Sequence, residues 1–274
     1  MTDPQSLPQL RSFDEKIRID IPQSARIWNY WMGGKDYYPI DREAGDAVIA
    51  VNPGIVTVAK QSRRFLIRAV TALAREYGIR QFLDIGTGLP TMQNTHEVAQ
   101  GVAPESKIVY VDNDPLVLTH ARALLTNTTP EGVTGYVDAD YHQPDQIVAD
   151  ARNILNFTQP MAVMFMGVLG HVPDFGEMRS IIDGIMAVVP AGSYLLLWDS
   201  TSTSDEVIQG RDMQEQTHIP YELRTVEELA ECFEGLEMLP PGLVSITQWR
   251  PEIVDARGES PAAIDAYGGL ARKP

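Results

Sequence analysis

The sequence contains a single cysteine and no long apolar run, and each shortage excludes a class of protein. Cys232 is alone in a chain of 274 residues, so an intramolecular disulfide is impossible. It lies among apolar positions of a predicted helix, which favours a packed thiol over a nucleophile. No stretch reaches the length of a membrane span, and the first residues have no signal-type apolar core. These features predict a cytoplasmic protein that does not bind membranes.

Basic residues are also scarce, because 22 Lys and Arg stand against 37 Asp and Glu. The resulting net charge of −15 repels phosphate backbones, and no dense basic run offsets it. We therefore expect no nucleic-acid partner. Apolar residues make up 44% of the chain, which is ordinary for a globular protein.

The first 60 residues are predicted to form a separate region before an α/β domain at 61–274. Residues 1–20 are expected to be a loosely ordered polar arm, and residues 21–53 are expected to form short helices broken by glycine. Their aromatic side chains have two possible roles. They form either a lid that excludes water and faces a cation, or a packed hydrophobic cap without ligand contact. The residues in question are Tyr30, Trp31, Tyr37 and Tyr38.

Strands alternate with helices in the rest of the chain. Apolar patterns predict strands at 81–85, 107–111, 135–137, 161–166 and 193–198, with late strands at 243–249 and 266–271. Helices are predicted at 65–77, 91–100 and 144–155 and after the caps Asp114, Asp174 and Thr225. This alternation predicts a doubly wound parallel sheet, whose ligands lie beyond the carboxyl ends of the strands. The long polar connection at 199–223 is predicted to be a lid or linker.

A glycine pair follows the first predicted strand, in Phe82-Leu83-Asp84-Ile85-Gly86-Thr87-Gly88-Leu89-Pro90. Gly86 and Gly88, with Thr87 between them, permit a tight turn and let a ligand lie against bare backbone. The next helix N-terminus attracts a ligand carboxylate. Asp84 is placed to hold an ammonium group, directly or through water. An ordinary strand-to-helix turn would use the same glycines, so both interpretations stay open at this point.

Acidic residues also end the next two strands. Asp112 can accept both hydroxyls of a ribose, while Asn113 can face an adenine. At the end of the third strand, Asp138 or Asp140 can accept from the adenine amino group while a backbone amide such as that of Ala139 meets the ring. The alternative is one solvated loop acid and one helix cap. Three acids at three consecutive strand ends favour a ligand with many donors and a positive centre over a pyrophosphate.

A nucleotide-dependent oxidoreductase is the competing interpretation of this loop. Dinucleotide sites normally carry a third glycine in the pattern G-x-G-x-x-G, whereas this sequence has Thr91 at that place. Asp84 would also face a pyrophosphate, which is an electrostatic conflict. Both observations disfavour the oxidoreductase.

These segments resemble the Rossmann-like S-adenosylmethionine-dependent methyltransferases. The run 82–88 is similar to their first motif, Asp112 to their ribose-binding acid and 138–140 to their adenine-contacting motif. More narrowly, the chain from about residue 21 to 274 resembles a bacterial family known as S-adenosyl methyltransferase, formerly a domain of unknown function. The similarity is carried by Ser24-Ala25-Arg26-Ile27-Trp28-Asn29-Tyr30-Trp31-Met32-Gly33-Gly34-Lys35-Asp36, by Gly86-Thr87-Gly88-Leu89-Pro90-Thr91, by Tyr110-Val111-Asp112-Asn113-Asp114-Pro115 and by Gly268-Gly269-Leu270-Ala271-Arg272-Lys273-Pro274.

The resemblance implies a mostly parallel, seven-stranded sheet whose last strand is antiparallel, with an N-terminal helical cap. It also implies S-adenosyl-L-methionine as cofactor. The segment Leu89-Pro90 departs from the third glycine that is commoner in such enzymes, which puts the local turn geometry in doubt.

The methyl acceptor is expected beside the loop that follows the fourth strand. Met166 and Gly167 begin this loop, and Gly167 permits close backbone approach to the ligand. His171 is the candidate general base, because the ordinary pKa of histidine lies near neutrality. A histidine that only bonds the loop backbone is the alternative.

Arg26, Lys35 and Arg63 are basic residues in acidic surroundings, and Arg63 is the preferred partner of the cofactor carboxylate. A solvated helix charge is the alternative for Arg63. We predict no metal site. The favoured function is methylation of a small-molecule acceptor, and the alternative is a non-catalytic S-adenosylmethionine sensor, since no obligatory catalytic group is evident.

Overall fold

The computed structural model describes residues 17–90, 93–124, 126–252 and 261–274. Predictions for residues 1–16 and for Thr91 fall outside these ranges. None of the helices among the described residues combines the length and hydrophobicity that spanning a bilayer requires.

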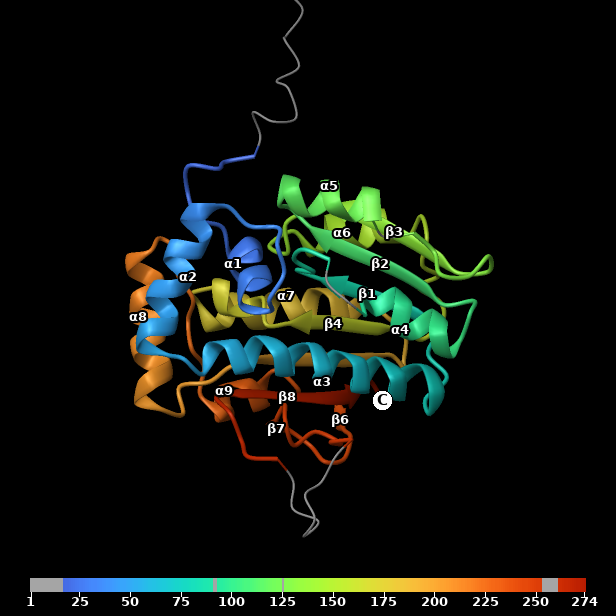
Figure 1. The fold of residues 1–274 in the computed structure, drawn as a ribbon. Coiled ribbons are helices and arrows are strands. Elements are labelled where there is room, and N and C mark those ends of the chain that lie inside the picture. Colours follow the sequence, from blue (N-terminus) through green and yellow to red (C-terminus); the bar gives the residue numbers. More distant parts are fainter. Residues whose placement is uncertain (1–16, 91–92, 125, 253–260) are drawn as a thin grey trace, which may run out of the picture.

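One sheet runs through the molecule in the order β3-β2-β1-β4-β5-β8-β6, with β7 paired to β8 (Figure 1). The first five strands are parallel neighbours, and β8 is antiparallel to β5, β6 and β7. The mostly parallel sheet with an antiparallel last strand is therefore confirmed, with eight strands among the described residues where seven were predicted. The strands are β1 (Gln81–Ile85), β2 (Lys107–Asp112), β3 (Val133–Asp138), β4 (Ala162–Met166), β5 (Tyr194–Ser200), β6 (Glu237–Met238), β7 (Val244–Ser245) and β8 (Ala266–Arg272).

Alternate residues of the central strands face two opposite layers of helices. Phe82 of β1 packs in the layer of α3 and α4, whereas Leu83 packs in the layer of α6, α7 and α9. Both faces are buried, which is why these strands are continuous apolar runs. The helices are α3 (Ile55–Arg75), α4 (Thr95–Val102), α5 (Pro115–Leu124), α6 (Pro144–Ala151), α7 (Phe175–Val188) and α9 (Val226–Glu231).

Two N-terminal helices, α1 (Ser24–Trp31) and α2 (Pro39–Val51), form a helical cap at one end of the sheet (Figure 1). The helix α8 (Asp205–Gln216) packs on α2 at the same end. A short 3-10 helix, η2 (Leu169–His171), follows β4 and contacts β5. The division of the chain at residue 60 stays a prediction, and this position lies within α3.

Several predicted elements have other bounds in the structure, and the helix predicted at 65–77 begins ten residues earlier, at Ile55. The connection at 199–223 contains α8, because Ser204 accepts from Val207 N at 3.3 Å and caps a helix with few buried apolar residues. The predicted helix at 91–100 begins at Thr95 after a capping box between Asn94 and Glu97. The predicted strand at 243–249 shortens to β7, because the chain turns after it.

Candidate functional site

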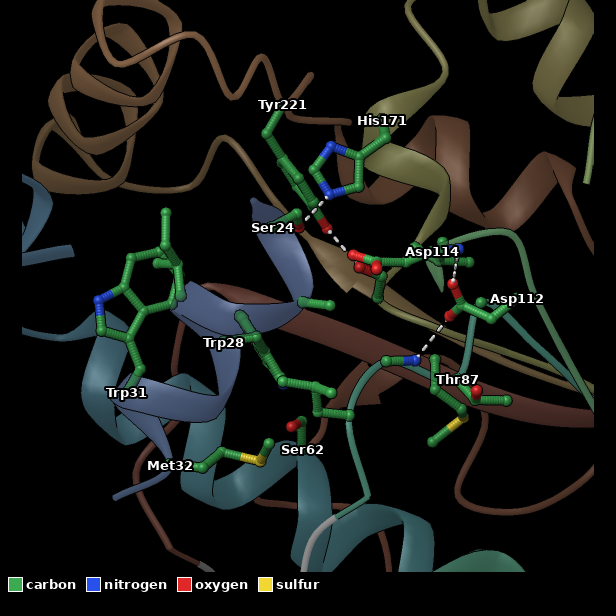
Figure 2. A pocket seen from close by; sticks show the side chains of 18 of the residues that line it. Ser24, Trp28, Trp31, Met32, Ser62, Thr87, Asp112, Asp114, His171 and Tyr221 are labelled. Carbon is green, nitrogen blue, oxygen red and sulfur yellow. Dashed lines mark hydrogen bonds between the residues drawn. The ribbon is translucent and has the colours of Figure 1, made fainter. Parts of the chain in front are cut away.

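A cavity of about 330 Å³ lies at the carboxyl ends of the parallel strands, beneath the helical cap. Figure 2 shows Trp28, Trp31 and Met32 on one side of it and Thr87 and Asp112 on the other. Most of the predicted site residues line this cavity, namely Arg63, Asp84, Gly86, Thr87, Gly88, Asp112, Asn113, Met166, Gly167 and His171. The structure therefore brings together residues from the ends of three strands, β1, β2 and β4, and from α3.

The two glycines after β1 have backbone conformations that other residues rarely adopt. Gly86 has φ +71° and Gly88 has φ +62°. A Cβ at Gly86 would lie 2.3 Å from Val168 Cγ2, so this glycine also allows the loop after β4 to approach. A Cβ at Gly88 would have no heavy atom within 4 Å, so this position leaves open space for a ligand.

Asp112 closes the glycine turn at the end of β2. Its Oδ2 accepts from Gly88 N, and its Oδ1 accepts from Asp114 N, both at 2.9 Å (Figure 2). Burial raises the pKa of this carboxyl to about 6, and the backbone amides oppose the shift. Each carboxylate oxygen has a further lone pair, so Asp112 can still accept hydrogen bonds from a diol.

Asp84 and Arg63 form a second polar group on the cavity wall. Asp84 is buried at the end of β1 and accepts from Thr95 Oγ1 at 2.6 Å. Burial raises the pKa of Asp84 to about 6, while the Thr95 hydroxyl and Arg63 oppose the shift. Burial also lowers the pKa of Arg63, which forms no hydrogen bond or ion pair with the residues described. Its guanidinium is thus available to a ligand carboxylate.

The acids at the end of β3 flank the cavity. Asp138, Ala139 and Asp140 do not line it, whereas the neighbouring Tyr141 does. Asp140 accepts from His142 N at 2.9 Å and from Asn113 Nδ2 at 3.4 Å. The adenine roles of 138–140 remain predictions.

An apolar wall faces these polar groups, made of Trp28, Trp31, Met32 and Trp198. The rings of Trp28 and Trp198 stack with centroids 5.9 Å apart, which joins α1 to the end of β5. A Cβ at Gly167 would lie 2.3 Å from the Trp198 ring, so only glycine fits there without displacing the indole.

His171 lies between the helical cap and the α/β domain. Its Nε2 is 2.7 Å from Ser24 Oγ on α1 (Figure 2). Its Nδ1 is 2.9 Å from the carbonyl oxygen of Pro220. Burial lowers the pKa of the imidazole below its usual 6.5, so the ring is neutral at pH 7. The structure shows the backbone contact of the alternative interpretation together with a second, unforeseen contact to Ser24.

Residues 11–274 match the family described as S-adenosyl methyltransferase. The chain belongs to this family. It is a methyltransferase, and S-adenosylmethionine is its cofactor. No curated protein sequence matches the chain.

Crystal structures of related proteins agree with this assignment. A DUF574 family protein from Streptomyces avermitilis MA-4680 is 44% identical and superposes with a TM-score of 0.88. The match covers 94% of this chain and 100% of the Streptomyces chain. A protein from Thermobifida fusca YX, provisionally assigned as a methyltransferase, is 35% identical, with coverages of 98% and 99% and a TM-score of 0.85. Magnesium protoporphyrin IX methyltransferase from Synechocystis PCC 6803, with bound SAM, shares the fold at 12% identity, 90% coverage of each chain and a TM-score of 0.51.

The aromatic residues of the methyltransferase cap divide into two groups. Trp28 and Trp31 line the cavity, as expected of a cover. Tyr30 instead packs edge to face on Tyr37, with centroids 4.9 Å apart, and neither of these rings lines the cavity. Tyr30 and Tyr37 therefore pack as in the hydrophobic-cap interpretation, whereas a lid role for Trp31 over a cation stays a prediction.

Arg26 holds the cap together and does not line the cavity. Its Nε lies 2.9 Å from Asp41 Oδ2, and both side chains are fully buried. Asp41 also accepts from the backbone amides of Gln23 at 2.9 Å and Tyr38 at 2.8 Å. The buried carboxylate thus ties the start of α1 to the start of α2.

Sequence reasoning missed Ser24, Trp198 and a buried pair behind His171. Tyr221 donates from its hydroxyl to Asp199 Oδ1, and burial raises the pKa of Asp199 to about 6. The strand-end rule offered a signal for Trp198 and Asp199, because both lie near the end of β5. Nothing in the sequence signals the pairing of Ser24 with a histidine 147 residues away.

Proposed function

We propose that this methyltransferase methylates a small-molecule acceptor that binds between the apolar wall and the loop after β4. The observation that carries the proposal is that one covered cavity holds both the glycine turn and the apolar wall. A cavity of about 330 Å³ suits a small organic ligand. The net charge of −15 also disfavours nucleic acid as the acceptor.

The residues of the strand-end rim, Asp84, Gly86–Gly88 and Asp112, fit an adenosyl amino acid. The open space at Gly88 would take ligand atoms against the backbone. Asp112 would accept from the ribose hydroxyls, and Arg63 would meet the carboxylate, since its guanidinium forms no hydrogen bond or ion pair with the described residues. Asp84 would face the ammonium group.

S-adenosylmethionine supplies a methyl group on a sulfonium, which transfers by in-line displacement. The indole rings of Trp28 and Trp198 would exclude water and present aromatic faces to the positive sulfur. Gly167 would let the acceptor approach the backbone after β4. His171 would take the proton of the acceptor, because burial keeps its ring neutral.

The test is transfer of label from methyl-labelled S-adenosylmethionine into a bacterial extract, followed by dialysis. We expect the fraction that passes the dialysis membrane to contain a labelled product that chromatography separates from S-adenosylmethionine, which also passes, and that is absent without the enzyme. The Asp112→Ala variant serves as a control with weakened cofactor binding. Label confined to retained protein or nucleic acid, or no label at all, would contradict a small-molecule acceptor.

A further inference from the structure

A hydroxyl group from the cap shields the nitrogen of His171 that faces the cavity. Ser24 is the first residue of α1, and its Oγ and His171 Nε2 are 2.7 Å apart. Both side chains line the cavity, so an acceptor bound there can reach this pair. Figure 2 shows the Ser24 hydroxyl directed at the imidazole ring.

Pro220 determines which nitrogen of His171 carries the proton. A carbonyl oxygen can only accept, so the 2.9 Å contact with Pro220 O places the proton on Nδ1. In the neutral ring, Nε2 then has a lone pair and accepts from the Ser24 hydroxyl. His171 is thus a neutral base, and the lone pair on its Nε2 already accepts a hydrogen bond from Ser24.

Ser24 has unused capacity to accept hydrogen bonds. A hydroxyl oxygen has two lone pairs, and Ser24 Oγ makes no hydrogen bond other than the one to His171 within the part of the chain that the structure describes. A proton from an acceptor can therefore reach Nε2 through Ser24, whereas direct transfer would require Ser24 to be displaced.

We propose that Ser24 takes the proton of a hydroxyl group on the methyl acceptor and passes its own proton to His171 Nε2. This inference rests on the proposed function, because it names the chemical class of the acceptor in the same cavity. A hydroxyl becomes strongly acidic as its oxygen is methylated, so it must lose its proton during the transfer. A neutral amine is nucleophilic enough to attack before it loses a proton, so it has less need of a base during the transfer. The wall of Trp28, Trp31 and Trp198 suits a flat apolar body on this hydroxyl compound.

The step balances in atoms and charge. The acceptor oxygen forms a bond to the methyl carbon while the methyl–sulfur bond breaks, and the sulfur keeps the electron pair. The acceptor proton moves to Ser24 Oγ, and the Ser24 proton moves to His171 Nε2. The positive charge thereby passes from the sulfonium to the imidazolium.

The hydrogen bond between Ser24 and His171 requires the helical cap to be docked on the α/β domain. On the cap side, Gln23 precedes Ser24, and its backbone amide donates to the buried Asp41. On the other side, Glu222 N donates to Gly170 O at 2.6 Å beside His171. Closure of the cap would thus complete the proton path.

The groups around His171 favour a ring that gains its proton only during the reaction. Tyr221 meets the imidazole edge-on, with centroids 5.0 Å apart, and its hydroxyl is engaged by Asp199. Arg224 donates to the carbonyl oxygens of Val172 and Pro173, just after η2. With the pKa of His171 below 6.5, activity should fall as the pH drops through that lowered value.

The decisive experiment compares Ser24→Ala, His171→Ala and the double variant, with Ser180→Ala on the surface of α7 as the control. Turnover is measured with labelled S-adenosylmethionine and the dialysable fraction of a bacterial extract. We expect each single variant to lose about 10²- to 10⁴-fold in turnover, with similar cofactor affinity by calorimetry. The double variant should lose no more than either single variant, because the two groups act as one unit. Ser24→Thr should restore part of the activity, and the labelled products should be methyl ethers or esters.

Nitrogen NMR of His171 in the resting enzyme gives a readout that needs no acceptor. We expect the neutral Nδ1–H form at pH 7 in the wild type and in Ser24→Ala, with the exposed His142 as internal reference. An Nε2–H form, or an imidazolium at pH 7, overturns the proton path whatever the turnover shows. Wild-type turnover in Ser24→Ala, additive losses in the double variant, or exclusively N-methyl products also overturn it. A wild type that labels no small molecule overturns the proposed function itself, which distinguishes the two failures.

Discussion

The strand-end rim and the apolar wall of the cavity are built in different ways. The rim depends on backbone conformation and on contacts between neighbouring strand ends, such as the bond from Gly88 N to Asp112. The wall depends on a contact between distant segments, Trp28 on Trp198, as does the neighbouring pair of Ser24 and His171. The proposed cofactor side is thus formed by the α/β sheet alone, whereas the proposed acceptor side requires a docked cap.

The largest effect should come from removing the carboxylate that organises the cap. Asp41→Ala leaves Arg26 as a buried charge without its partner, which should cost about 3–5 kcal/mol of the free energy of unfolding. Urea denaturation of the purified protein measures this change. Asp46→Ala on the same helix is the control, because its ion pair with Arg42 at 3.5 Å and its hydrogen bond from the Tyr30 hydroxyl are both exposed, so the loss should be about 1 kcal/mol. Equal losses in the two variants would show that the cap does not depend on the buried pair.

A second pair of variants separates packing from backbone strain in the rim. Gly88→Ala should cost about 1–2 kcal/mol of stability, since only the left-handed conformation is penalised. Gly86→Ala should cost about 1–3 kcal/mol more, because its new methyl group also collides with Val168. Thermal and urea unfolding of both variants gives the difference, and a Gly86→Ala protein as stable as Gly88→Ala would contradict the packing described.

Measurements of cofactor affinity should distinguish Asp112, which belongs to the rim, from Asp140, which lies beside it. Asp112→Ala should weaken S-adenosylhomocysteine binding by about 1–3 kcal/mol through lost charged hydrogen bonds. Asp140→Ala should have a smaller effect, of about 1 kcal/mol or less, because Asp140 already accepts from His142 and does not line the cavity. Isothermal calorimetry measures both. Unchanged affinity in Asp112→Ala would remove this residue from the site.

The pH dependence of binding provides a smaller test of the rim. Asp84 and Asp112 have pKa values raised to about 6, so both are protonated below that pH and ionised above it. Cofactor affinity should therefore rise with pH from 5 to 7, by about tenfold for each carboxylate that must be ionised. Calorimetry at both pH values checks this, and Asp112→Asn should flatten part of the slope. A higher cofactor affinity at pH 5 than at pH 7 would contradict the roles assigned to the two ionised carboxylates.

The sequence was informative about the rim because its signals are local. Gly86, Gly88 and Asp112 lie at strand ends, and the parallel topology alone brings such ends together. The acceptor side was harder to predict. The helical pattern of the cap indicated helices, but the ion pair of Arg26 with Asp41 depends on how α1 and α2 dock. The polar α8 lacked an apolar stripe and could not be told from a loop.

The strand-end rim and the apolar wall are proposed to enclose one ligand site. A crystal structure of the protein with S-adenosylhomocysteine tests this most directly. We expect the ligand to lie against the backbone of Gly86–Gly88 with its ribose bonded to Asp112. Its sulfur should face the side of the cavity that Trp28 and Ser24 line. A ligand bound outside this cavity, or a ribose that does not touch Asp112, would contradict it.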